Sequence, residues 1–168
     1  MSDNKTGPLV IHGWAVFAHP LFIAHIDILT RQVEALKKKD PRGYIKKNAS
    51  KRLAAITKLV FDVIPQDPTR AEYRQGGTLG EEHKHWFRAR FFQQYRPFFR
   101  YHVPGKTIVF AWVNDDDTKR AYEGSDDAYR VFRKMLERGH PPDDWNQLLV
   151  ESRAAGNRLR LPAADGTT

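Results

Sequence analysis

The pattern of hydrophobic and polar positions predicts that the chain starts with a strand and continues into a helical hairpin. Residues 9–18 alternate weakly and are rich in Val, Ile, Phe and Trp, which predicts one strand. From Leu21 the apolar positions recur every three or four residues, which predicts a helix that ends at Lys37–Lys39. A second helix is predicted to start with Asp40 as its N-cap and to end near Pro65.

Beyond this hairpin the pattern changes from helical spacing to alternation. Residues 65–85 are rich in Pro, Gly and polar types and are predicted to form a long loop. The alternation that follows predicts strands at about residues 86–92, 96–103 and 106–114. Pro104-Gly105 is suited to a tight turn between the last two strands.

Helical spacing returns near the end of the chain. It predicts a helix over residues 125–138, which Gly139 stops, and a last short helix over residues 143–153. Residues 154–168 are predicted to be a disordered tail. The chain is therefore expected to be one α+β domain, residues 1–153, without internal repeats.

The composition changes this picture by indicating the kind of partner. Lys and Arg number 28 and Asp and Glu 20, so the net charge is +8, which favours an acidic polymer such as nucleic acid, or less often an anionic membrane surface. The most apolar early stretch, residues 9–29, is interrupted by His, Asp and Pro, so we expect neither a membrane span nor a signal peptide. The absence of Cys excludes disulfide scaffolds, Cys-based zinc sites and thiol catalysis, and permits a reducing cytosol.

The positive charge is concentrated in two regions, the first of which lies on the helical hairpin. Nine cations occur between Lys37 and Lys58, and Asp40 is the only acidic residue among them. Lys46 and Lys47 are candidate phosphate contacts in this run. A solvated face of an amphipathic helix is the competing interpretation.

The second basic region coincides with the predicted sheet. From His83 to Lys106 there is no Asp or Glu, and the cations are Lys84, Arg88, Arg90, Arg96, Arg100 and Lys106. Because alternate residues of a strand point to opposite faces, Arg88 and Arg90 should share one face, and Arg96, Arg100 and His102 should share one. Antiparallel pairing would then gather four guanidinium groups on one face of the sheet.

Such a gathering of like charges costs stability and calls for a compensating anion. Guanidinium groups bind phosphate oxygens with two parallel hydrogen bonds, and the interleaved aromatic side chains could stack unpaired bases. The sheet therefore favours RNA or single-stranded nucleic acid as ligand. The alternative is a half-exposed sheet on which the Arg stems cover apolar surface.

Metal and cofactor chemistry finds little support in the motifs. His83-x-His85 and Asp115–Asp117 lack the spacing of zinc helices or calcium loops, and Gly76-Gly77-x-x-Gly80 is not followed by the Gly-Lys-Ser/Thr of a P-loop. We expect no metal and no cofactor. RNA cleavage without metal is chemically possible, because the 2′-OH is a nucleophile that RNA itself carries, and His102 and His140 are candidates for the proton transfers.

Several longer motifs carry a family resemblance. The runs are His12–Pro20, Tyr95–Tyr101, Trp112–Asp115, Asp127–Phe132 and Met135–Trp145. Over about residues 10–150 the chain resembles the YhaV-type toxins of bacterial type II toxin–antitoxin systems.

The resemblance implies a RelE-like fold: an antiparallel sheet of about four strands with helices on one face, an N-terminal αα-hairpin and C-terminal helices. It also implies a cytoplasmic endoribonuclease that cleaves mRNA, at least partly on the ribosome. A PrlF-type antitoxin would neutralise it, and the toxin–antitoxin complex would bind operator DNA and repress its own operon.

The resemblance also implies roles for individual residues. Arg88 is the first candidate for clamping the phosphate and stabilising the transition state, and Arg96 and Arg100 would bind phosphate. His140 would donate or accept a proton, and Tyr122 is a further candidate. Arg90 stands where relatives can have Lys. We expect catalysis to involve Arg88, Arg100, His140 and Tyr122, and we expect RNA to be bound by Arg90, Arg96, His102, Lys84, Lys46 and Lys47.

Two other classes of function share these features. A nucleic-acid-binding module without catalysis would also need the basic sheet, but it would not need His140 beside Arg88. A pure interaction protein would use the basic helix face to bind an acidic partner.

Overall fold

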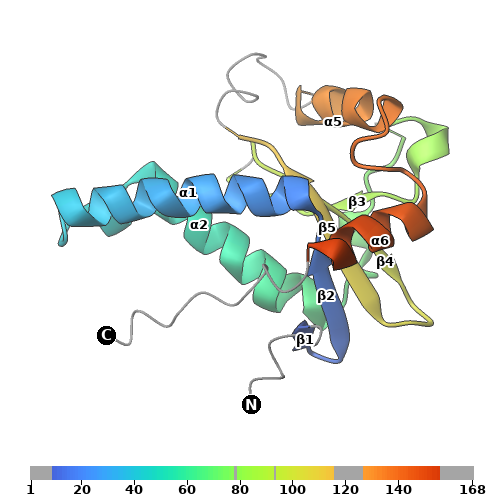
Figure 1. Cartoon of the computed structure of the whole chain (residues 1–168), viewed down its shortest axis with the longest axis horizontal. Coiled ribbons are helices and arrows are strands. Elements are labelled where there is room, and N and C mark those ends of the chain that lie inside the picture. Colours follow the sequence, from blue (N-terminus) through green and yellow to red (C-terminus); the bar gives the residue numbers. More distant parts are fainter. Residues whose placement is uncertain (1–8, 78, 93, 116–126, 156–168) are drawn as a thin grey trace.

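The computed structural model describes residues 9–77, 79–92, 94–115 and 127–155 of the chain. A five-stranded sheet lies at its centre with the strand order β1-β2-β5-β4-β3. Helices cover both faces of this sheet: α1 and α2 lie on one side, and α5 and α6 lie on the other (Figure 1). The α+β class is confirmed, whereas the expected single helical layer is wrong.

The central strands match the predicted ones closely. They are β4 (Pro97–His102) and β5 (Thr107–Val113), which pair antiparallel around the predicted turn. The edge strand β3 (Phe87–Arg88) is much shorter than predicted. Phe87 pairs with Phe99, but only an isolated bridge between Phe91 and Tyr95 continues the antiparallel contact.

The first predicted strand is in fact a hairpin. It consists of β1 (Leu9–Ile11) and β2 (Trp14–Ala18), joined by His12 and Gly13, which have φ angles of 51° and 85°. Two consecutive positive φ angles give the turn whose twist suits a two-residue hairpin. β2 then pairs in parallel with β5, so the sheet is mixed and has five strands, rather than the expected four in an antiparallel arrangement.

The helical hairpin begins as predicted but its second helix starts later. α1 (Pro20–Lys39) has His19 as its N-cap, whose Nδ1 accepts from the amide of Leu21. The Asp40 side chain accepts from the amide of Gly43 and forms a turn, so Asp40 is not the N-cap of the second helix.

A short helical turn precedes that second helix. The turn is η2 (Tyr44–Lys46), and α2 (Asn48–Lys58) follows it. The helix continues through a wider turn, η3 (Leu59–Val63), into α3 (Ile64–Gln66). Two more short turns, η4 (Ala71–Tyr73) and η5 (Glu81–His83), lie in the predicted long loop.

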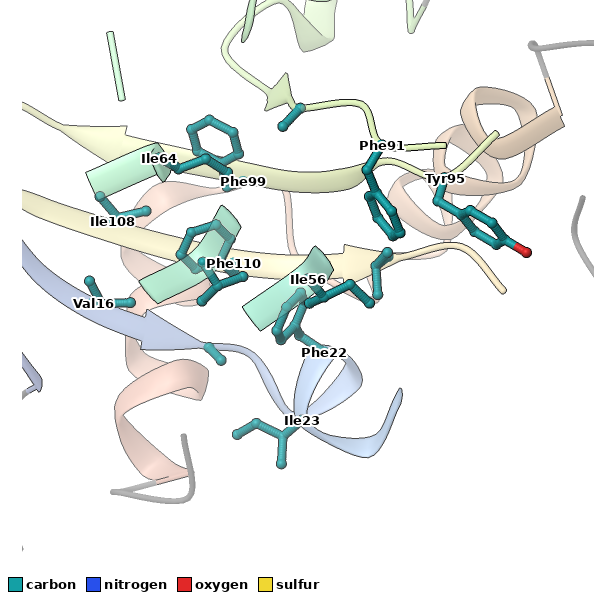
Figure 2. Packing of buried hydrophobic residues seen from close by; sticks show 14 of the residues in the cluster. Val16, Phe22, Ile23, Ile56, Ile64, Phe91, Tyr95, Phe99, Ile108 and Phe110 are labelled. Carbon is teal, nitrogen blue, oxygen red and sulfur yellow. The ribbon is translucent and has the colours of Figure 1, made fainter. Parts of the chain in front are cut away.

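The helical hairpin covers one face of the sheet and forms the first core. Phe110 of β5 and Phe99 of β4 point to the same side as Phe22 of α1 and Ile56 of α2 (Figure 2). All four side chains are almost completely buried. At about 25 cal/mol per Å² of buried apolar area, such residues supply most of the stabilisation of this layer.

The opposite face carries a second core, formed with α5 (Asp127–Glu137) and α6 (Trp145–Ala154). Phe132 of α5 stacks on Phe98 of β4 with ring centroids 4.4 Å apart. Leu148 of α6 is fully buried in the same cluster. The basic face of the sheet is therefore covered by helices, which the sequence did not predict.

The ends of the predicted domain are described only in part. Ala154, placed in the tail by the sequence, is the last residue of α6, and residues 156–168 lie outside the described residues. The predicted turn and irregular segment at residues 116–124 also lie outside them. Within the described ranges, no helix has both the length and the apolar character that a membrane span requires.

Candidate nucleic-acid interface

Two of the predicted arginines meet at a tyrosine of α5. Arg88 donates from Nε to the Tyr129 hydroxyl at 2.6 Å, and from Nη1 to the Glu72 carbonyl at 2.8 Å. The Arg96 guanidinium lies over the ring of the same tyrosine, 5.3 Å from its centroid. Tyr129 thus holds two guanidinium groups from neighbouring parts of the sheet.

Arg100 lies on the same face, between two tryptophans. Its guanidinium is 5.5 Å from the ring centroid of Trp86 and 5.3 Å from that of Trp145. Its Nη1 donates to the Asp143 carbonyl at 2.6 Å, which fixes the side chain at the start of α6. His102 stacks on Trp145 at 5.8 Å, so it follows Arg100 on this face, as alternation predicts.

The strand register explains why the three arginines share a face. Arg88 pairs with Phe98, and Arg96 and Arg100 each lie two residues from Phe98 along the chain. Side chains two positions apart point to the same side of a strand. Among the described residues, none of the three arginines forms an ion pair with a carboxylate; their recorded acceptors are backbone carbonyls and a hydroxyl.

Burial makes the charge of two of these arginines costly. Burial lowers the pKa of Arg96 from its usual value, and the nearby charges of Arg90 and Arg88 lower it further, against the opposing effect of Tyr129. Burial likewise lowers the pKa of Arg100, although the nearby carboxylates of Asp143 and Asp144 oppose this effect. Arginine stays protonated in proteins, so the lowered values express an electrostatic cost that a bound anion would relieve.

Most of the interleaved aromatic residues are not accessible for base stacking. Five of them are buried in the two cores, because helices cover both faces of the sheet: Trp86, Phe91, Tyr95, Phe98 and Phe99. Phe92 is 50% exposed. Phe87 and Tyr101 are half-buried and stack on each other with ring centroids 4.6 Å apart. Stacking of bases on the sheet therefore stays a prediction for these three residues.

His140 is exposed and lies beside His19. The two rings are 5.7 Å apart, and His19 follows β2. The structure therefore brings together Arg88, Arg96 and Arg100 on one face, and the role of His140 beside them stays a prediction.

The other predicted contacts are spread over the surface. Arg90 is exposed just beyond β3. Lys84 forms an ion pair with Glu81 at 3.1 Å and lines a pocket of about 450 Å³ with Arg74, Phe87 and Tyr101.

Two lysines lie at the tip of the helical hairpin. Lys46 and Lys47 are exposed there, away from the sheet (Figure 1). Arg52 of the same basic run is instead buried over the ring of Tyr95, so it is not part of a solvated face. Tyr122 lies outside the described residues.

Sequence reasoning missed two features of this region. Tyr129 lies within the motif Asp127–Phe132, and its helical spacing from Phe132 on the buried face of α5 is the signal that points to it. His83, His85 and Asp143 form the one group among the described residues that could hold a metal ion. The third member lies 58 residues beyond His85, so no local motif could reveal it.

Fold and site together define a basic α+β protein with a group of three buried or half-buried arginines that form no ion pair among the described residues and suit phosphate. The model of the family described as "Toxin with endonuclease activity, of toxin-antitoxin system" matches residues 16–153. Toxin YhaV of Escherichia coli O6:H1 is 45% identical over 147 residues, which cover 86% of this chain and 96% of that protein. Ribonuclease toxin YhaV of Escherichia coli K12 is 44% identical over the same length.

The chain belongs to the YhaV toxin family. No solved structure matches it.

Proposed function

We propose that this protein is an endoribonuclease toxin that cleaves mRNA without a metal ion. The observation that carries the proposal is the group of three guanidiniums on one face of the sheet, two of which meet at Tyr129. The endonuclease activity of the family and the ribonuclease name of a relative support it.

The reaction uses a nucleophile that the substrate carries. The 2′-oxygen attacks the adjacent phosphorus, the bond to the 5′-oxygen breaks, and a 2′,3′-cyclic phosphate remains. Arg88 and Arg100 stabilise the extra negative charge of the phosphorane, and Arg96 and the exposed Arg90 bind flanking phosphates. Fixed donors in a dry site stabilise such charge more than solvated ones do, because they need no reorganisation during the reaction.

A histidine transfers the protons in this scheme. His102 and Arg100 both contact Trp145, and His140 lies beside His19, so both histidines remain candidates. Separate substitutions of His102 and His140 by Gln, with pH–rate profiles, assign the role. Loss of one limb of the profile identifies the histidine that titrates in the reaction.

The partners follow from membership of a toxin–antitoxin family. A PrlF-type antitoxin binds and neutralises the protein, and the complex represses its own operon at operator DNA. The toxin acts in the cytoplasm, at least partly on translating ribosomes. Lys84, Lys46 and Lys47 contribute longer-range attraction to RNA.

The test is incubation of the purified protein with an RNA oligonucleotide in EDTA, with and without ribosomes. Cleavage to fragments that end in a cyclic or 3′-phosphate is the expected result. A fully 2′-O-methylated copy of the same oligonucleotide is the matched control, which should bind but remain intact. Cleavage of that copy would contradict attack by the 2′-OH.

The same group of arginines would also serve a second candidate function, a nucleic-acid-binding module without catalysis. Such a module would retain RNA but leave it intact in every arm of the experiment. A protein that works only through its basic helix would show neither cleavage nor dependence of toxicity on Arg88.

A further inference from the structure

His83, His85 and Asp143 form a compact group of metal-ligating atoms at the edge of the second core. Asp143 Oδ1 lies 3.1 Å from His83 Nδ1 and 2.8 Å from His85 Nε2. Each residue offers one ligand atom, and the three atoms all lie within 4.8 Å of one another. We propose that this group binds one divalent transition-metal ion of the Zn²⁺ type.

The distances suit such an ion after a small outward movement. Zn²⁺ binds His nitrogen and carboxylate oxygen at about 2.0–2.2 Å in tetrahedral geometry, which separates neighbouring ligand atoms by about 3.3–3.5 Å. The nitrogen–oxygen separations here are a few tenths of an ångström shorter. Two histidines and one carboxylate, with a fourth position left for water, form a common ligand set for this class of metal.

The surroundings hold the ligands in place. Gln75 donates from Nε2 to the His83 carbonyl at 2.9 Å, which fixes the backbone of the η5 turn. Arg100 fixes the backbone of Asp143, and Trp86 donates from Nε1 to the Asp143 carboxylate at 2.7 Å. Donors to a ligating carboxylate orient it and are a regular part of metal sites.

An acidic residue also stands behind the first histidine. Glu82 Oε2 lies 3.9 Å from His83 Nε2, the ring nitrogen that does not face Asp143. A carboxylate on this side favours the tautomer that presents a free Nδ1 to a metal. The carboxylates of Asp143 and Glu82 attract a cation, and the nearby Arg100 guanidinium offsets part of that attraction.

The site has an entry path and joins distant parts of the chain. The side chains of His85 and Asp143 are both 37% exposed, whereas that of His83 is 10% exposed. A bound ion would connect the loop before β3 to the bend before α6 and would hold the residue that anchors Arg100. The consequence is added stability, which does not depend on the proposed reaction.

The test is addition of Zn²⁺ alone to EDTA-treated, dialysed protein, followed by calorimetric titration and thermal unfolding. We expect one ion per chain and a Tm rise of about 5–10 °C at roughly 100 times the Kd. Cobalt should give the visible absorption of a tetrahedral site. His85→Gln and Asp143→Asn should each weaken binding by about 100-fold or more.

The chain offers a matched control in a second His–Asp pair. His12 Nε2 lies 3.0 Å from Asp62 Oδ1, but the structure places no third ligand there among the described residues. His12→Gln, and also His140→Gln, should leave Zn²⁺ binding unchanged. Far-UV circular dichroism shows whether each variant folds. A similar loss of Zn²⁺ affinity in folded His85→Gln and folded Asp143→Asn then reports the loss of a ligand and not a loss of structure.

The outcomes separate this inference from the proposed function. Wild-type protein that takes up no Zn²⁺, or that responds like the His85 and Asp143 variants, overturns the metal site even if RNA is cleaved in EDTA. Stoichiometric Zn²⁺ binding that both variants abolish supports the site, whatever happens to RNA. Metal binding without RNA cleavage in any buffer would count against the proposed function alone.

Discussion

Arg88 is the residue on which the proposed chemistry depends most. It lies on the short edge strand β3, half-buried, with two of its nitrogens held by Tyr129 and the Glu72 carbonyl. A side chain held at two points is ready to bind phosphate without losing further conformational freedom. Arg96 is buried, whereas Arg88 is half-buried like Arg100, so solvent and ligand reach Arg88 more easily than Arg96.

Arg88→Ala should lower the rate of RNA cleavage by about 10²–10³, because one preorganised transition-state donor is lost. Binding of the 2′-O-methylated oligonucleotide should weaken far less. The measurement is single-turnover cleavage beside a binding titration. Arg31→Ala, at an exposed site on α1, is the control and should change neither. Equal losses in rate and affinity would make Arg88 a simple phosphate anchor.

Tyr129→Phe tests whether the hydroxyl positions Arg88. The ring that packs against Arg96 and Phe98 remains, so the protein should lose only about 1–2 kcal/mol of stability. Cleavage should fall by about tenfold, because Arg88 loses its 2.6 Å anchor. Urea unfolding and kcat of the same preparation provide the two values. An unchanged kcat would show that the Tyr129 hydroxyl does not position Arg88 for the reaction.

At the scale of elements, the helical hairpin and the sheet carry charge for different reasons. The sheet arginines are fixed in a dry layer, whereas the lysines of η2 and the start of α2 are solvated. Solvated cations contribute to RNA affinity through counterion release, which is sensitive to salt and indifferent to the chemical step.

Substituting Lys46 and Lys47 together by Ala should reduce the slope of log affinity against log salt by about one unit for each lost contact. Cleavage at saturating RNA should stay the same. Filter binding at several salt concentrations measures the slope, and a multiple-turnover assay measures the rate. A large loss of kcat in this variant would place the active site on the helical hairpin instead.

At the scale of the whole molecule, His19 connects the two helical layers. It is fully buried, caps α1 through Nδ1, and donates from Nε2 to the Glu151 carboxylate of α6 at 2.8 Å. Burial lowers its pKa below the ordinary 6.5, although the Glu151 carboxylate opposes this effect, and His140 lowers it slightly further.

This lowered pKa predicts a loss of stability in mild acid. The unfolded chain takes up the His19 proton near pH 6.5, before the folded protein does, so the free energy of unfolding decreases as the pH falls below that value. Glu151, whose pKa is also lowered, contributes only at more acidic pH. Unfolding by urea between pH 7.5 and 5.5 should show the decrease.

The His19→Asn variant keeps an N-cap acceptor but removes the titrating ring. It should therefore be less stable at neutral pH and show a smaller decrease over the same interval. His12→Asn, on the exposed hairpin turn, is the control and should keep the wild-type dependence. If the free energy of unfolding of His19→Asn depends on pH as strongly as that of the wild type, groups other than His19 cause the dependence.

The sequence by itself determined the features that depend on local periodicity. Alternation in β4 put Arg96, Arg100 and His102 on one face, and the spacing of apolar residues gave α1 nearly its full length. These features follow from the fixed geometry of a strand or helix, which any stretch of suitable sequence expresses locally. The net charge and the absence of cysteine likewise follow from the sequence alone, and with them the preference for an acidic partner and the exclusion of Cys-based chemistry.

Only the tertiary structure decided what covers that face. Residues far apart in the sequence bring His140 beside His19, and the docking of α5 supplies Tyr129. Asp143 reaches His83 and His85 across 60 and 58 residues of sequence. Such contacts depend on which surfaces pack together over the whole chain, and no local pattern of residues specifies that choice.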